Sequence, residues 1–369
     1  MRLTTVLIAI GIFPSHIFAQ SGSAGAVPID SIPRTSYSLS DPVTLPIGAL
    51  GSPVSAIFGC PGDGSVFLQV ATMPGVGQAT GDVALYGVRG ANEIVQFNSH
   101  LATGYRLISP IARYFASESK VVGLAYGLGI DHGDAKVGPD PNRVSNVLLT
   151  FDRKGALLST DVLDPNLKPE QLAAFSSGDL LLVAWDKVRK MTYLSVTDAH
   201  GSTQREIHFR DNDPADDGNG SSPLATLTIY PYGEHLLLVP QDTRRPIVEV
   251  NEHGVLNSYT MKIPAGYTRG LALSFGRRSW KFRMLKEDNG SQPVQAAQTD
   301  GNSKIGLASL QSIQGIVLEF NPDDGNVIRE IDLPQTGFQP ACENNGEVTF
   351  VSARAGDGKL QIAKGVAAR

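Results

Sequence analysis

One pattern recurs five times in this chain and limits what it can fold into. A short apolar run ends in Asp or Asn, a Gly follows within a few residues, and a second apolar run begins. Apolar runs broken at Asp or Asn and Gly are typical of two antiparallel strands joined by a tight turn. The runs with their anchors are 94–97 with Asn98, 147–151 with Asp152, 193–197 with Asp198, 247–250 with Asn251 and 316–320 with Asn321, and the turn glycines are Gly104, Gly155, Gly201, Gly254 and Gly325.

The spacing of these hairpins predicts the fold class. Successive anchors are 54, 46, 53 and 70 residues apart (152−98, 198−152, 251−198, 321−251), which is the size of one four-stranded propeller blade. A further pair of apolar runs precedes each hairpin, as at 172–175 and 180–184 around Gly178. We predict an all-β fold, a single β-propeller of six blades. Seven blades are the alternative, because the longest interval leaves room for another unit between Gly270 and Ser312.

The last repeat is incomplete. It stops after residues 360–363, so its fourth strand is missing. Residues 43–46 match the closing strands at 261–264 and 331–334, since each ends in an apolar residue followed by Pro. We therefore predict that the N-terminal strand at Val43 completes the last blade and closes the ring, which leaves no free sheet edge between the chain ends.

The repeat resembles that of the NHL propellers, whose unit is a Gly, an apolar strand, a variable loop, and a strand that ends in Asp or Asn before a Gly turn. Residues 178–209 and 233–263 match this unit best, and the resemblance covers most of residues 54–363. The polar motif that joins the second and third strands in that family is absent from every copy here. The resemblance implies a binding scaffold, since enzymes are a minority among such propellers.

The N-terminus predicts export. Arg2 precedes an apolar run at 3–13, and Ile17-Phe18-Ala19 stands before Gln20, the order of regions in a secretory signal peptide. We predict a signal peptide at 1–19, a flexible leader at 20–35 and one propeller domain at 36–369, secreted to the periplasm or the extracellular space. An uncleaved N-terminal anchor is the alternative. No later apolar run is long enough to cross a membrane as a helix, so the mature chain is expected to lack a transmembrane segment. We also expect a monomer.

The two cysteines occupy the same repeat position. Cys60 and Cys342 each stand four residues before the turn glycine of their blade, Gly64 and Gly346. The first and last blades are neighbours in a closed ring, so the two thiols could reach disulfide distance in an exported protein. We predict a Cys60–Cys342 disulfide. Two buried thiols that pack as small apolar residues are the alternative.

Long irregular segments predict where a ligand binds. They lie at 72–92, 131–146, 210–223 and 287–303, and the propeller register places all four on one face. Asp131, His132 and Asp134 combine an imidazole with carboxylates there and are candidate binding residues, with His132 also a candidate acid or base. Asp211, Asp213 and Asp217 are candidate calcium ligands. Because the spacing fails the EF-hand pattern at Ala215 and Leu224, a solvated turn is the alternative.

His235 and Glu234 at the start of a second strand are further candidate catalytic residues; a partly exposed strand end is the alternative. A net charge of −5 gives no positive field for nucleic acid. We predict a secreted scaffold that binds a protein, peptide or glycan on its long-loop face and needs no cofactor. The alternative is a metal-dependent hydrolase or lyase with its site at the channel mouth.

Overall fold

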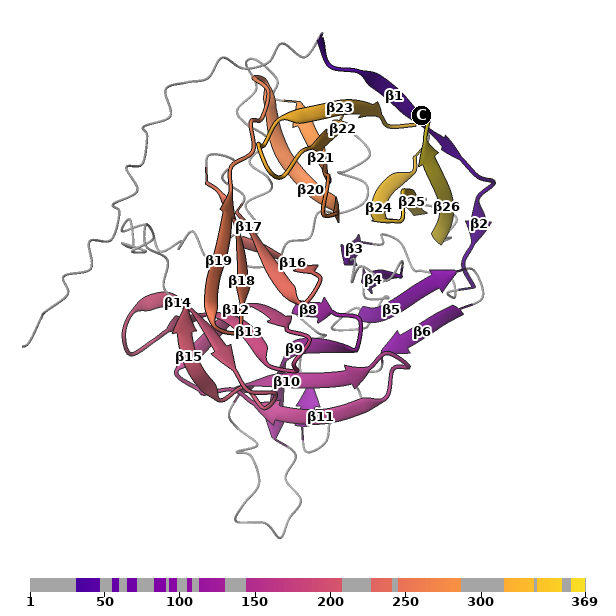
Figure 1. Ribbon diagram of the computed structural model, residues 1–369. Helices are drawn as coiled ribbons and strands as arrows, with labels where there is room; N and C mark the ends of the chain where they lie inside the picture. Colours follow the sequence, from indigo (N-terminus) through magenta and orange to yellow (C-terminus); the bar gives the residue numbers. More distant parts are fainter. Residues whose placement is uncertain are drawn as a thin grey trace, which may run out of the picture.

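The computed structural model describes residues 31–46, 55–59, 65–71, 83–90, 93–97, 105–107, 113–129, 144–207, 227–240, 245–286, 315–334, 337–353 and 360–368. These ranges contain strands, turns and short irregular stretches, and no α-helix. The sheets are arranged around a common centre (Figure 1), so the prediction of an all-β propeller is confirmed. Within the same ranges, no helix has the length and apolar character needed to cross a membrane.

Four sheets are separate in their strand pairing. The first consists of β3 (Ser55–Gly59), β4 (Val66–Ala71), β5 (Val83–Gly90) and β6 (Glu93–Phe97). The second consists of β7 (Tyr105–Leu107), β8 (Arg113–Ala116), β9 (Lys120–Gly129), β10 (Val144–Asp152) and β11 (Leu157–Val162). The third consists of β12 (Leu167–Ala174), β13 (Leu180–Asp186), β14 (Met191–Thr197) and β15 (Thr203–Ile207), and the fourth of β16 (Leu227–Tyr232), β17 (His235–Pro240), β18 (Ile247–Asn251) and β19 (Gly254–Tyr259).

The remaining nine strands form one curled sheet in the order β20-β21-β22-β23-β1-β26-β25-β24, with β2 also paired to β26. Its members are β20 (Tyr267–Phe275), β21 (Trp280–Lys286), β22 (Gly315–Phe320), β23 (Val327–Asp332), β24 (Gln339–Asn344), β25 (Glu347–Ala353), β26 (Leu360–Ala367), β1 (Arg34–Leu39) and β2 (Val43–Thr44). Two antiparallel runs, β20 to β23 and β24 to β26, are therefore joined through β1.

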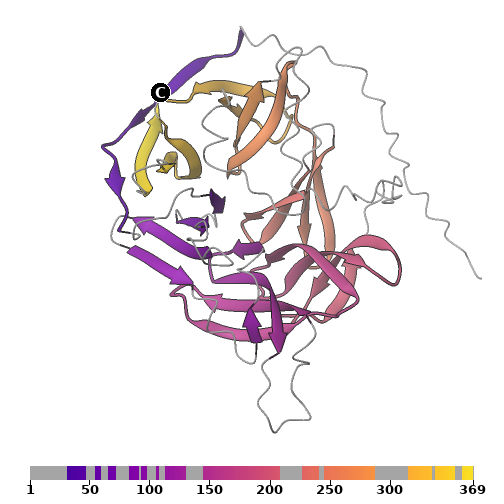
Figure 2. The same ribbon diagram turned by 180° about the vertical axis from the view of Figure 1, so that it is seen from behind.

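The two N-terminal strands tie the ends of the chain together. Val43 of β2 pairs with Ile362 of β26, as the sequence predicts for the strand at Val43. β1 adds a connection that the sequence does not predict: it pairs in parallel with β23 and then antiparallel with β26. Figures 1 and 2 show β1 along the outside of the ring between these two strands. The N-terminal segment thus covers the edge of one run and completes the other.

Four of the five predicted hairpins form at their Asp or Asn anchors. In the β14–β15 turn, Asp198 Oδ1 accepts hydrogen bonds of 2.9 Å from the backbone N–H groups of both His200 and Ser202. Gly201 of that turn has a φ of 85°, where a side chain would be strained. The Asp or Asn side chain accepts hydrogen bonds from backbone N–H groups of the turn, and the glycine adopts the positive φ that the turn requires. This is why an Asp or Asn and a Gly occur together in all four of these hairpins.

The fifth predicted hairpin, at Asn98 and Gly104, is wrong. Residues 93–97 form β6, an outer strand paired with β5, and β7 belongs to the next sheet. The predicted irregular segment 72–92 is also wrong in part, because it contains β5. The glycines of β5 are typical of a loop. Gly87 nevertheless lies within the strand, where its missing side chain leaves space for the ring of Phe67, since a Cβ at position 87 would lie 3.2 Å from that ring.

The core lies between neighbouring sheets. Trp280 of β21 is fully buried, and its ring meets Tyr259 of β19 with centroids 4.7 Å apart. The other side of the same run faces β24, where Lys281 and Glu343 form a buried ion pair. One run of strands therefore contacts one neighbour through aromatic rings and the other through charges, which fixes its place in the ring.

Candidate functional site

The strands of each run leave two unlike ends. The short-turn end carries the turns between first and second strands and between third and fourth strands. The long-loop end carries the connections between second and third strands and the links to the next run. Most predicted site residues lie outside the described residues: Asp131, His132, Asp134, Asp211, Asp213 and Asp217. The roles predicted for them stay predictions.

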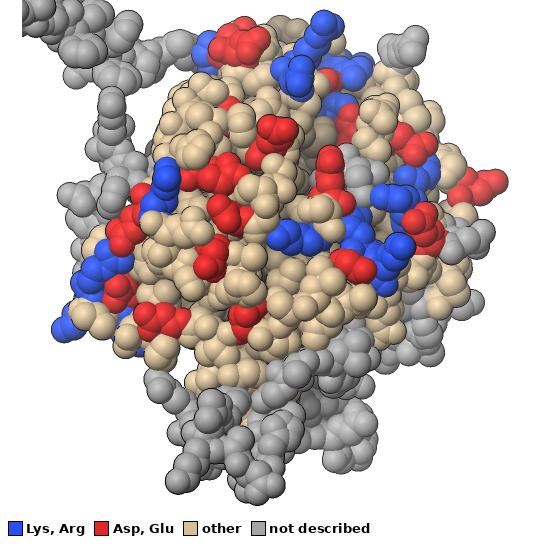
Figure 3. Space-filling model, turned by 60° about the horizontal axis from the view of Figure 1, so that its bottom comes forward, with Lys and Arg blue, Asp and Glu red and all other residues tan. Residues whose placement is uncertain are grey.

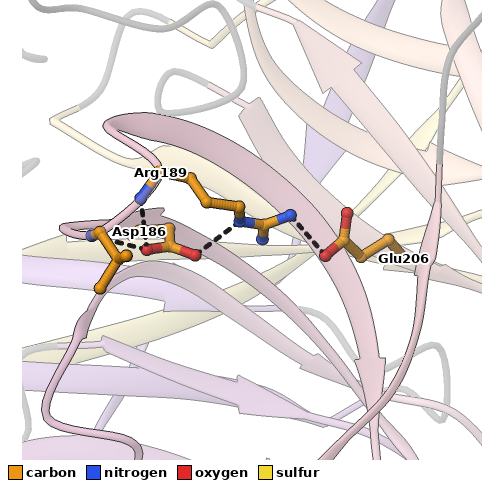
Figure 4. A network of polar contacts seen from close by, with 4 residues as sticks. Asp186, Arg189 and Glu206 are labelled. Carbon is orange, nitrogen blue, oxygen red and sulfur yellow. Dashed lines mark hydrogen bonds and ion pairs between the residues drawn. The ribbon is translucent and has the colours of Figure 1, made fainter.

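The β13–β14 turn is a tight, fully described connection at the long-loop end (Figure 4). Asp186 accepts hydrogen bonds from the backbone N–H groups of Val188 and Arg189, and Arg189 also forms ion pairs with Asp186 and Glu206 at 2.6 and 2.7 Å. The backbone hydrogen bond from Arg189, followed by its side-chain bond, lowers the pKa of Asp186. Asp186, Arg189 and Glu206 satisfy one another and Lys187 Nζ donates to the carbonyl of Pro165, so the turn is structural.

Polar side chains gather at the start of the inner strands. We call β3, β8, β12, β16, β20 and β24 the inner strands, because each lies at the edge of its antiparallel run that is nearer the centre of the propeller (Figure 1). β12 contacts both β8 and β16, and β24 contacts both β20 and β3. Five of their residues define what we call the inner-strand ring: Arg113 of β8, Glu170 of β12, Thr228 of β16, Arg269 of β20 and Gln339 of β24.

Strand register places these five residues at one height. Arg269 of β20 pairs with Met284 of β21. Met284 lies four positions past Trp280, which is the first residue of β21 that pairs with β20. Arg113, Thr228 and Gln339 pair with residues three or four positions past the same point in their own sheets. Glu170 has no partner, but the residues on either side of it pair three and four positions past that point. Since each inner strand starts at the long-loop end, the inner-strand ring lies at that end of the propeller.

The inner strands are irregular at this height. The pairing of β12 slips between Pro169 and Gln171, which leaves Glu170 as the extra residue of a β-bulge. The pairing of β20 also slips beside Arg269, and that of β24 slips just after Gln339, between Pro340 and Cys342. Bulges re-aim side chains and are common next to functional sites. Three of the five ring residues thus lie at or beside such an irregularity.

The hydrogen bonds of the inner-strand ring are incomplete. Arg113 Nε donates to the backbone carbonyl of Glu170 at 3.1 Å, and Arg269 Nη2 donates to the carbonyl of Pro240 at 2.6 Å. In contrast, the buried oxygens Glu170 Oε2 and Gln339 Oε1 accept no hydrogen bond. Gln339 is only 9% exposed. Buried polar atoms without partners are rare in folded proteins and call for an explanation such as a ligand.

Positive groups outnumber negative ones at this end of the inner strands. Burial raises the pKa of Glu170, while the charges of Lys168 and Arg113 oppose that rise, which places both cations near its carboxylate. Burial lowers the pKa of Arg113. Arg269 is 8% exposed and adds a third cation at the same height. The charged members of the ring, together with Lys168, are therefore three cations and one carboxylate.

His235, a predicted catalytic candidate, lies at the short-turn end. Its Nδ1 is 2.6 Å from Glu249 Oε1, and Glu249 Oε2 accepts hydrogen bonds from Asn257 and Tyr259. Glu234 is exposed in the adjacent turn. Burial would raise the pKa of Glu249, but the hydrogen bonds from its three partners outweigh burial and lower it. The partner of His235 is thus Glu249, and the only sequence signal for it was a carboxylate within an apolar strand.

No group of three His, Cys, Asp or Glu side chains suited to a metal ion occurs within the described ranges. Acidic and basic side chains are intermingled on the face in Figure 3. The sequence matches no family model and no curated protein.

Several solved structures resemble the chain over most of its length at low identity. A protein of unknown function from Dyadobacter fermentans is 10% identical, with a TM-score of 0.46, and the match covers 90% of this chain and 99% of that one. The β-propeller domain of Cps50 (Swd1) from Myceliophteria thermophila is 11% identical, with a TM-score of 0.40 and coverage of 89% and 99%. YCF48 bound to D1 peptide is 10% identical, with a TM-score of 0.37 and coverage of 91% and 98%.

Proposed function

We propose that this protein is a binding propeller that takes its ligand at the long-loop end, over the inner-strand ring. One observation carries the proposal: two buried oxygens of that ring, Glu170 Oε2 and Gln339 Oε1, accept no hydrogen bond. A fold that leaves such atoms unpaired loses stability, about 1 to 3 kcal/mol for each group. A ligand that donates to them recovers the loss on binding.

The irregular strands support the same site. The pairing of the inner strands β12, β20 and β24 is irregular, and shifts of register also occur between outer strands, as in β10–β11 and β14–β15. The irregularities of the inner strands lie near the ring residues, whereas the Asp and Asn turns between third and fourth strands lie at the other end. Natural proteins retain such departures from regular pairing where binding requires them.

A screen of peptides, glycans and small metabolites by thermal shift tests the proposal, with two tryptophan variants as controls. Thr228 is exposed on the inner strand β16, and Ser258 is exposed on the outer strand β19 of the same sheet. Thr228→Trp should abolish the shift given by a true ligand because it blocks the ring, whereas Ser258→Trp should leave that shift unchanged. A ligand that stabilises both variants equally would place its site elsewhere and refute the proposal.

We further propose that the propeller has six blades and is closed by a Cys60–Cys342 disulfide. The two runs of the nine-stranded sheet then count as two blades, the second completed by β2. Cys342 is buried among Val66 and Leu68 of β4, and no free thiol occurs among the described cysteines; Cys60 lies outside the described residues. Thiol alkylation of the unfolded, unreduced protein should leave both cysteines unlabelled. A disulfide would also agree with export.

A further inference from the structure

We infer that the place of β1 on the outside of the ring is a strand-binding site that exchanges its occupant: β1 leaves it reversibly, and the β1 of a second copy of this chain binds there instead. We call it the β1 site. It consists of residues 330–332 at the edge of β23, residues 365–367 at the edge of β26, and the ring of Phe350. The inference does not depend on what binds over the inner-strand ring.

Backbone pairing holds β1 along two short stretches. Residues 34–36 pair in parallel with β23, and residues 37–39 pair antiparallel with β26. Of the side chains of β1, only that of Tyr37 is buried, and its ring meets that of Phe350 with centroids 5.2 Å apart. Leu39 adds a close contact, since a Cβ at Gly365 would lie 2.9 Å from it. The site therefore fits an extended strand that carries one aromatic side chain.

The two runs beside β1 also contact each other without it. β20 and β24 pack together, and Glu343 of β24 accepts hydrogen bonds from Lys281 Nζ at 2.5 Å and from Ser274 Oγ at 3.2 Å. The Lys281–Glu343 ion pair is buried, and none of these groups belongs to β1. The contacts between the runs remain when β1 leaves, so we expect β1 to open while the rest of the ring stays folded.

Tyr37 holds β1 imperfectly. Its buried hydroxyl has no hydrogen-bond partner among the described residues. Burial raises the pKa of this hydroxyl, and the charges of Glu343 and Glu319 raise it further. A buried hydroxyl without a partner costs stability that a phenyl ring would not. Tyr37 thus gives β1 its main apolar contact and at the same time weakens its hold, a combination that favours exchange.

A fluorescent peptide of residues 31–44, added to the full chain and followed by fluorescence anisotropy, tests the inference. The peptide competes with the chain's own β1, so its apparent affinity rises with the fraction of chains that β1 has left. Tyr37→Ala in the chain should therefore tighten binding of the peptide by about tenfold or more, because it removes the ring that holds β1 in place.

Tyr37→Phe gives the sharper result, because it keeps the ring and removes the unpaired hydroxyl. In the chain it should weaken binding of the unaltered peptide severalfold, since the chain's own β1 is then held more firmly. In the peptide the same substitution should tighten binding severalfold. Tyr114→Phe in the chain is the matched control. The hydroxyl of Tyr114 donates to the carbonyl of Phe67 in a region without β1, so this variant should bind the peptide like the unaltered chain.

The oligomeric state of the full chain tests whether a second copy supplies the strand. Small-angle X-ray scattering should show a monomer that gives way to a dimer as the protein concentration approaches about 1 mM, the order of the effective concentration of a strand tethered in its own chain. Excess free peptide should dissociate this dimer, because it occupies the β1 site of both copies.

Three results would overturn the inference. The peptide binds no form of the chain, Tyr37→Phe in the chain leaves the affinity for the peptide unchanged, or the protein stays monomeric at every concentration up to about 1 mM. If Tyr37→Ala fails to fold, the opposite effects of Tyr37→Phe in the chain and in the peptide decide the first part of the test alone.

Discussion

The two ends of the strands differ in how several of their acidic and amide side chains are paired. At the short-turn end, Asp198 accepts two backbone hydrogen bonds and Glu249 accepts three from side chains. At the long-loop end, Glu170 and Gln339 of the inner-strand ring each leave a buried oxygen unpaired. Satisfied polar groups hold a fold together, whereas unsatisfied ones weaken it and are retained where they meet a ligand. The difference identifies which end is built for stability.

The largest effect should come from a glycine of the short-turn end. Gly325 and Gly346 have φ values of 70° and 84°, so alanine is strained at both. At Gly325 a Cβ would also collide with the carbonyl oxygen of Thr260, whereas at Gly346 it would meet nothing within 4 Å. Gly325→Ala should cost about 3 kcal/mol or more of unfolding free energy, and Gly346→Ala about 1 to 2 kcal/mol.

Urea unfolding of the two alanine variants measures this difference. Equal losses would mean that backbone strain alone limits these turns and that the segment after β19 that carries Thr260 does not support the β22–β23 turn. The difference between the two ends would then rest on hydrogen bonds alone and not on steric contacts of the turns.

A smaller effect should follow acidification. Because the pKa of Glu249 is lowered in the folded protein from its ordinary 4.5, the carboxylate contributes stability that is complete above that value. That contribution is lost as the pH falls through the lowered folded pKa. Glu249→Gln should therefore be less stable than the parent at pH 7 and show a shallower loss of unfolding free energy below about pH 4.5.

The control for this measurement is Glu234→Gln in the adjacent turn, since Glu234 is exposed and Glu249 is the carboxylate that contacts His235. Glu234→Gln should keep the acid dependence of the parent. Identical pH profiles for the parent and Glu249→Gln would show that the network around Glu249 adds nothing to stability.

The turns that the sequence predicts correctly lie at the short-turn end, and the features that it does not predict depend on contacts between separate strands. Asp198 with Gly201 announces a turn because local hydrogen bonds and backbone conformation determine it, and Val43 was recognisable from the missing strand it replaces. Gly87 contributed to the wrong prediction of an irregular segment at 72–92, since this glycine makes room for Phe67 of another strand. The sequence does not predict the inner-strand ring. Arg113 and Gln339 lie at the same height only because of the strand register in two separate sheets, and no local sequence pattern encodes that register.

The smallest effect should be the most informative about the two ends. Asn257 donates to Glu249 at 2.8 Å at the short-turn end, whereas the amide oxygen of Gln339 has no partner. Asn257→Leu should lower the free energy of unfolding by about 1 to 2 kcal/mol because it removes a bond to a charged group. Gln339→Leu should change it by less than about 0.5 kcal/mol or raise it, since leucine removes an oxygen that burial penalises. A loss above about 1 kcal/mol for Gln339→Leu would show that this oxygen stabilises the fold, and the reason for placing a ligand over it would disappear.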